Sequence, residues 1–200
     1  MELANLATLP LWFALFLFST TCHEAAHAWV AKLGGDDTAS RGGQVSLDPL
    51  PHVRRHPLGM IAFPILSFLL NGGRWMIGWA SAPYDPAWAS RHPRRAAWMS
   101  LAGPSANLIL ALLAGIGIHI GVAAGVFEAP ASPATDRLVE AAGGGAHLGT
   151  IALSVLFSLN LLLFTFNLLP VPPLDGNGVV GLFLPEDLHR KWQDLFREPM

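Results

Sequence analysis

The chain has 200 residues, of which 52% are hydrophobic and only 13% are charged. A soluble domain carries about 25% charged residues, so this composition argues against a soluble globular enzyme. Lys and Arg nearly balance Asp and Glu, which leaves neither a basic surface for nucleic acid nor an acidic tail. We therefore expect one compact domain that lies in a lipid bilayer and has no nucleic-acid partner.

Apolar segments in chain order predict the membrane helices. They cover residues 6–31, 58–70, 96–127 and 148–169. A helix needs about 20 apolar residues to cross a bilayer, which all of these segments except the second reach. Pro64 and the Asn71-Gly72-Gly73 turn suggest that the second segment forms a re-entrant or interfacial hairpin. The predicted fold is an all-α polytopic membrane protein, with three to four transmembrane helices and a short re-entrant or strand-like segment.

The polar connections predict less regular structure. Residues 44–49 fit a short strand and a turn, and residues 74–95 combine Trp and Tyr with Arg, as at a membrane–water interface. Residues 128–147, rich in Ala, Pro and Gly, suggest a flexible loop. We expect a membrane-embedded domain over 1–184 and an amphipathic tail over 185–200.

The first apolar segment carries His23-Glu24-Ala25-Ala26-His27 in its last third. On a helix, residues four apart project from one face, so both imidazoles can bind one metal ion. Glu24 is then placed to take a proton from a metal-activated water. The alternative is a pair of interfacial histidines beside a glutamate that reaches toward water. A carboxylate within an apolar helix is costly without a partner or a function, which favours the metal site.

A catalytic zinc needs a third protein ligand, and Asp175 is the downstream candidate. It follows Pro170, Pro172 and Pro173, which end the fourth helix. Irregular backbone at membrane depth is tolerated where it is buried in protein or lines a watery cavity. The alternative for this stretch is an ordinary helix-ending turn outside the membrane.

At these motifs the sequence resembles the site-2 protease family of intramembrane zinc metalloproteases, in its compact bacterial branch. The family's N-x-x-P-x-P-x-x-D-G motif is matched from Asn167 to Gly176, and its A-G-P-x-A-N element by residues 102–107. Gly78-Trp79-Ala80 looks like the start of its G-W-A-x-P segment. The resemblance covers residues 20–178 and implies one zinc per chain, a transmembrane protein substrate, and residence in the bacterial inner membrane.

The resemblance also implies roles for single residues. His23, His27 and Asp175 would bind the zinc, Glu24 would act as general base, and Asn167 would hold the substrate backbone or the developing oxyanion. His52 could polarise a carbonyl, stabilise an oxyanion or be structural. The family's H-x-D-P-x-G element is altered in this region, with two residues inserted and His56 where an aspartate is usual. For Asn107, substrate contact and the cross-linking of helices stay open.

Two questions of function stay open at this point. The rival to a protease is a catalytically silent zinc-containing membrane scaffold or chaperone, although the intact Glu24 speaks for an enzyme. Strand-like pieces near 43–47 and 79–84 could pair with an extended substrate. The sequence leaves the substrate's identity and the oligomeric state open.

Charge and geometry together predict a topology. His27 and Asp175 both lie near the C-terminal ends of their segments, so segments one and four should run in the same direction to share an ion. With three full crossings and a re-entrant second segment, eleven of the twelve Lys and Arg residues lie on one side and Arg137 on the other. Lys and Arg favour the cytoplasmic side, which predicts an outside N-terminus and an active site nearer the cytoplasmic face.

Overall fold

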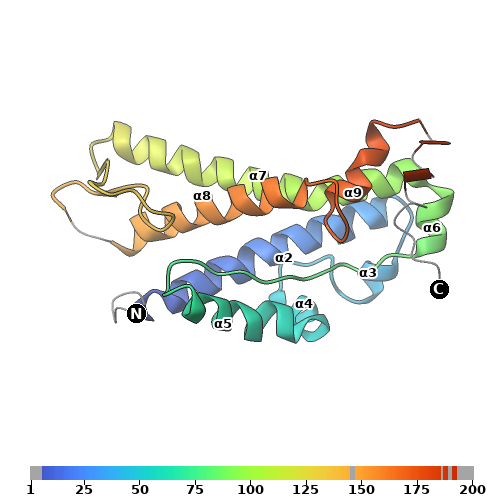
Figure 1. Cartoon of the computed structure of the whole chain (residues 1–200), viewed down its shortest axis with the longest axis horizontal. Helices are drawn as coiled ribbons and strands as arrows, with labels where there is room; N and C mark the ends of the chain where they lie inside the picture. Colours follow the sequence, from blue (N-terminus) through green and yellow to red (C-terminus); the bar gives the residue numbers. More distant parts are fainter. Residues whose placement is uncertain (1–5, 145–146, 186, 189–190, 193–200) are drawn as a thin grey trace.

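A computed structural model describes residues 6–144, 147–185, 187–188 and 191–192. Three long helices form the body of this part: α2 (Leu9–Leu33), α7 (Pro93–Ala123) and α8 (Leu148–Asn167). α7 packs against both α2 and α8. Figure 1 shows α2 and α8 running in the same direction, as predicted, and α7 in the opposite one.

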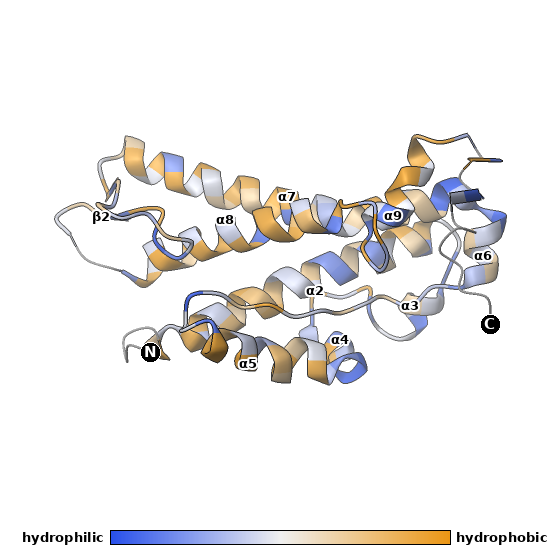
Figure 2. Ribbon diagram, viewed as in Figure 1, coloured by the Kyte–Doolittle hydropathy of each residue, from blue (hydrophilic) through white to orange (hydrophobic). Residues whose placement is uncertain are grey.

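The surface of the long helices is that of a membrane protein. In the described part of the chain, α7 and α8 are the two helices long and apolar enough to cross a membrane. Leu112, Ile116 and Ile120 on α7 are each more than half exposed, and hydrophobic residues follow α7 and α8 along their lengths (Figure 2). Water disfavours such an apolar face, whereas lipid does not. α2 has 25 residues, which is also long enough to cross, but it includes the charged residues Glu24 and Lys32. A third crossing by α2 therefore stays a prediction.

The second apolar segment forms one arm of a hairpin. It consists of a π-helical turn, η1 (Leu58–Ala62), and α5 (Phe63–Leu70). Gly72 and Gly73, with φ of 68° and 79°, then turn the chain, a conformation that suits glycine. Residues 75–85, which we call the extended segment, run back beside α2 without forming a helix or strand (Figure 1). Both ends of the hairpin lie toward the same end of the molecule, which is the shape expected of a re-entrant hairpin.

Arg74 lies at the tip of this hairpin, which changes the predicted charge balance. Its backbone oxygen accepts a hydrogen bond from Thr135 Oγ1 at 3.3 Å. Thr135 belongs to the loop between α7 and α8, on the side to which only Arg137 was assigned. The placement of Arg74 was therefore wrong, because the hairpin reaches farther than its short helix suggests. The excess of basic residues on the other side remains.

Three short helices lie in the connections between the longer elements. α4 (Pro49–Arg55) and α6 (Pro86–Arg91) both start at an Asp-Pro pair, in which the aspartate side chain accepts a backbone hydrogen bond two residues on. α3 (Thr38–Arg41) precedes them. The strand predicted within 44–49 is absent, because Ser46 and Asp48 turn the chain into α4 instead.

The loop between α7 and α8 is more ordered than predicted. Phe127–Glu128 (β1) pairs with Glu140–Ala141 (β2) in an antiparallel sheet. The Phe127 ring lies against Gly121, where a larger residue would collide with it. After α8, the chain forms α9 (Gly176–Val179) and a 3-10 turn, η2 (Val180–Leu182). The predicted amphipathic tail falls largely outside the described residues.

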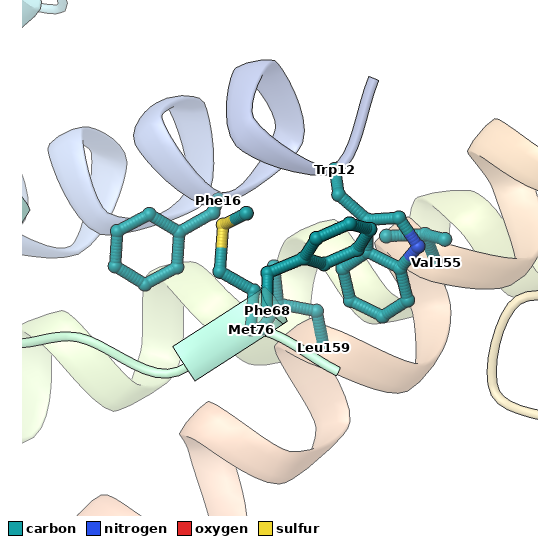
Figure 3. Close-up of a cluster of buried hydrophobic side chains, with 6 residues drawn as sticks. All are labelled: Trp12, Phe16, Phe68, Met76, Val155 and Leu159. Atoms are coloured by element: carbon teal, nitrogen blue, oxygen red, sulfur yellow. The ribbon is translucent and has the colours of Figure 1, made fainter. Parts of the chain in front are cut away.

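An apolar core holds the hairpin to the long helices (Figure 3). Trp12 and Phe16 of α2 pack with Met76 of the extended segment, and the cluster also contains Phe68 of α5 and Val155 and Leu159 of α8. Each side chain is at most 1% exposed. Burying a side chain of this size contributes about 1.5–3 kcal/mol. The core thereby fixes the extended segment beside α2 and α8, where it becomes a wall of the site.

Candidate metal centre

His23 and His27 lie one helical turn apart on α2 and face the same point. Their Nε2 atoms are 3.0 Å apart, and the rings meet edge to face with centroids 4.6 Å apart. Asp175 reaches the same point from the other end of the chain. Its Oδ2 lies 3.1 Å from His23 Nε2 and its Oδ1 lies 3.3 Å from His27 Nε2. Two imidazole nitrogens and a carboxylate oxygen are a ligand set that zinc accepts.

The outer nitrogens of both rings are held by acceptors. His27 Nδ1 donates to the backbone oxygen of Met99 at 2.7 Å. A carbonyl can only accept, so this nitrogen carries a hydrogen. His23 Nδ1 lies 2.6 Å from Asn107 Oδ1 and likewise donates. In a neutral ring, each Nε2 then presents a lone pair toward the other and toward Asp175.

This arrangement fits a cation. Two lone pairs 3.0 Å apart cannot bond to each other, and both face a carboxylate. A positive charge between the three groups satisfies all of them at once. Metal-ligating histidines almost always donate their other N–H to a carbonyl or carboxylate, and both rings here do so. We conclude that His23, His27 and Asp175 can hold a metal ion.

Glu24 lies beside the cluster and is 4% exposed. Its Oε2 is buried and has no hydrogen-bond partner among the described residues. An unpaired buried carboxylate oxygen is costly in a purely structural role. Its place in the wall of the same cavity as both histidines suits a group that exchanges protons with a bound molecule.

Glycines let the backbone approach the cluster closely. A Cβ at Gly103 of α7 would meet the Nε2 atoms of both histidines. After Asn167, the chain folds back so tightly that Gly176 lies against the carbonyl oxygens of Leu168 and Leu169. Gly178 lies equally close to Ser100 of α7. These contacts fix the loop that presents Asp175, and they explain the small residues around both motifs.

A cavity of about 790 Å³ opens onto the cluster. Its walls come from α2, the start of α7, the last turns of α8, the loop that carries Asp175, and the extended segment. Asn167 is part of the wall, and its Nδ2 donates to Leu163 of its own helix at 2.9 Å. Its Oδ1 and its second N–H are free of intrahelical bonds.

Two other residues singled out in the sequence lie elsewhere. Asn107 is fully buried between helices, does not line the cavity, and cross-links helices in this structure. His52 is fully buried in α4, where its Nε2 lies 3.2 Å from the backbone oxygen of Ser46. That position is away from the cavity and suits the structural alternative. His56, nearby, contacts Ser81 of the extended segment.

Sequence reasoning did not single out Met99, which bonds to His27, or Asn160, which bonds to Asn107. Met99 acts through its backbone, and no side-chain pattern could reveal it. Asn160 had a signal, because it is an amide in the middle of a largely apolar helix. Such a residue within a membrane helix is costly and marks a function or a polar contact. Its side chain reaches Asn107 and Ser19, both next to the site.

Comparison with known proteins identifies the family. The model of peptidase family M50 matches residues 11–198. "Putative zinc metalloprotease YwhC" of Bacillus subtilis is 32% identical over 188 residues, which cover 93% of this chain and 74% of the relative. "Putative zinc metalloprotease Rip2" of Mycolicibacterium smegmatis is 31% identical over 178 residues, 88% of this chain and 58% of the relative. No solved structure matches. The chain therefore belongs to peptidase family M50, the site-2 protease family of zinc metalloproteases.

Proposed function

We propose that this chain hydrolyses peptide bonds within or next to the transmembrane segments of other membrane proteins. The observation that carries the proposal is the His23–His27–Asp175 cluster beside a buried Glu24, in a cavity between helices that expose apolar faces. A soluble peptide would not meet such a surface, whereas a transmembrane helix moving in the bilayer would.

The residues of the site divide the chemistry between them. His23, His27 and Asp175 would hold the zinc ion, which when bound would supply Lewis-acid chemistry for hydrolysis. Glu24 would accept the proton of the attacking water and pass it to the leaving amine nitrogen. Its burial, with an unpaired oxygen in the cavity wall, supports this role. Asn167 at the cavity wall can offer an N–H or an oxygen to the substrate backbone.

The substrate must enter in an extended form, because a helix shields its peptide bonds with its own hydrogen bonds. The extended segment supports the proposal that it pairs with such a substrate. Ile77 and Trp79 turn their backbone groups toward the hairpin helix, where they bond to Ser67 and Gly59. Neighbouring residues of an extended chain point their backbone groups to opposite sides. Those of Gly78 and Ala80 thus face away, and they form no backbone hydrogen bond within the described residues.

A catalytically silent scaffold is the rival function. It would keep the zinc and bind helices without cutting them. A protein of that kind has no use for a buried carboxylate with an unpaired oxygen beside its metal site, so Glu24 favours the enzyme. We further propose that the protein resides in the bacterial inner membrane, with the zinc nearer the cytoplasmic face. The excess of Lys and Arg at the end of the bundle where α2 ends supports this orientation.

Comparison of membrane proteomes tests the proposed activity. Cells that produce the wild-type chain are compared with cells that produce Glu24→Gln, and membrane-protein fragments are identified by mass spectrometry. We expect fragments cut within or near transmembrane segments in wild-type cells only. Equal fragment patterns, with both proteins present at equal levels and loaded with zinc, would favour the scaffold.

A further inference from the structure

A chain of buried polar side chains joins all three long helices behind the metal site. It consists of Ser19 on α2, Asn107 on α7 and Asn160 on α8, and each is fully buried. Asn107 Nδ2 donates to Asn160 Oδ1 at 2.8 Å, and Asn160 Nδ2 donates to Ser19 Oγ at 2.9 Å. Buried amides in an apolar bundle are costly to place, so a purely hydrophobic contact would serve packing better.

Backbone oxygens set the direction of these hydrogen bonds, and the strongest of them acts at Asn160. Asn107 Nδ2 lies 3.5 Å from the backbone oxygen of Ser19, a distance too long to hold the amide by itself. Asn160 Nδ2 also lies 2.8 Å from the backbone oxygen of Leu156, which can only accept. The nitrogen of Asn160 must therefore face Leu156, and its oxygen must face Asn107. The nitrogen of Asn107 then faces Asn160, and its oxygen faces His23 Nδ1 at 2.6 Å.

This order decides which nitrogen of His23 can bind the metal. An oxygen at Nδ1 requires the hydrogen there and leaves the lone pair on Nε2, toward the metal. A flipped Asn107 amide would instead offer an N–H to Nδ1. The hydrogen of a neutral ring would then move to Nε2, which could no longer bind zinc. His27 needs no intermediate side chain of this kind, because the Met99 carbonyl fixes its Nδ1 directly.

We propose that Asn160 is a positioning residue for the metal site. Through Asn107, it fixes the tautomer and the orientation of His23, although it touches neither the metal nor the cavity. Ser19 supports it by accepting the second N–H of its amide. The inference rests on the zinc site of the proposed function but not on proteolysis.

Zinc affinity of the purified full chain, measured by competition with a chelator, tests the proposal. Loss of such an outer hydrogen bond to a metal ligand lowers metal affinity about 10- to 100-fold, which we expect for Asn160→Leu. Ser154→Ala is the matched control, because Ser154 is a fully buried polar residue of the same helix that bonds to Leu138 and Thr150. Its zinc affinity should equal that of the wild type.

Repeating the Asn160→Leu substitution in a chain that already carries Asn107→Asp separates two roles of Asn160. One is the orientation of His23 through Asn107, which we call the relay, and the other is simple packing. In Asn107→Asp, both atoms that can face His23 Nδ1 are oxygens, so the tautomer no longer depends on Asn160. Asn160→Leu should then not lower zinc affinity in this background, because at residue 107 it removes only a contact between Asn160 Oδ1 and a carboxylate oxygen. The ¹⁵N chemical shifts of the histidine rings in the metal-free chain give a direct readout, with the His23 hydrogen on Nδ1 in the wild type and on Nε2 in Asn160→Leu.

The possible results distinguish the relay through Asn107 from packing and from a failure of the metal site. Unchanged zinc affinity and unchanged His23 shifts in Asn160→Leu would overturn the relay while the zinc site stands. An equal loss of affinity in both backgrounds would assign Asn160 to packing alone and also overturn it. A wild-type chain without zinc affinity would overturn the metal site itself, whereas zinc binding without proteolysis would leave the relay intact.

Discussion

Replacement of Gly103 by alanine should damage the metal site directly, through the addition of a single methyl group. A Cβ at this position would overlap His27 Nε2 and lie 2.6 Å from His23 Nε2 and 2.7 Å from His23 Cε1. The rings cannot retreat, because hydrogen bonds of 2.6 and 2.7 Å hold their Nδ1 atoms on the far side. Either these bonds break or α7 moves away from α2.

The size of the effect follows from the cost of overpacking. An extra methyl group in a closely packed site costs about 1–3 kcal/mol, and each 1.4 kcal/mol is a factor of ten in affinity. We therefore expect zinc affinity to fall about 5- to 150-fold in Gly103→Ala, on the same conversion.

Chelator competition on the purified protein measures this loss. Gly117→Ala is the control in the same helix, since its Cβ would lie 3.2 Å from the end of the Leu153 side chain, which can move aside. Its zinc affinity should match the wild type. Wild-type affinity in Gly103→Ala would refute the close approach of α7 to both histidines and with it the geometry of the site.

Three further predictions concern the extended segment, the loop after α2 and the topology. Ala80→Pro removes an N–H that has no backbone partner in the described residues and is proposed to pair with the substrate. Cleavage of transmembrane substrates should therefore fall while zinc content stays unchanged, whereas loss of zinc would give Ala80 a structural role instead. Burial raises the pKa of Asp36, but hydrogen bonds from Thr38 and from the backbone of Asp85 outweigh it and lower the pKa below its ordinary value. The stability that Asp36 contributes should therefore be complete above about pH 4 and be lost as pH falls further, so thermal melts of wild type and Asp36→Asn should converge in acid; a difference that persists there would contradict this. In a variant without Cys22, cysteines at Asp37 and Ser90 should be labelled from the cytoplasm only and a cysteine at Thr135 from the opposite side; opposite labelling of 37 and 90 would contradict the hairpin.

The sequence predicted the long helices and the metal cluster because both follow local rules. The lengths of the apolar runs and the positions of the prolines predict the ends of α7 and α8 to within a few residues. Pro93 nevertheless starts α7 earlier than the apolar run suggests. The spacing of His23 and His27 fixes their common face through helix geometry alone. The motif at Asp175 supplied the third member, and the direction of α8 followed from the need to bring it there.

The features that the sequence did not predict depend on contacts between distant segments. The absent strand at 44–49 reflects capping by Asp48, whose side chain competes with extended structure. The position of Arg74 depends on how far the hairpin reaches, which apolar length alone does not show. The roles of Asn107 and Asn160 depend on helix packing across 53 residues of sequence. No local pattern contains that information.

Zinc bound per purified chain, in wild type, Glu24→Gln and Asp175→Asn, tests the central assignment most directly. One zinc is expected in the wild type and one in Glu24→Gln, because Glu24 is proposed as a base and not as a ligand. A clear loss is expected in Asp175→Asn, since the amide that replaces the carboxylate is a poor ligand for zinc. Loss of zinc from Glu24→Gln together with full zinc in Asp175→Asn would contradict this assignment.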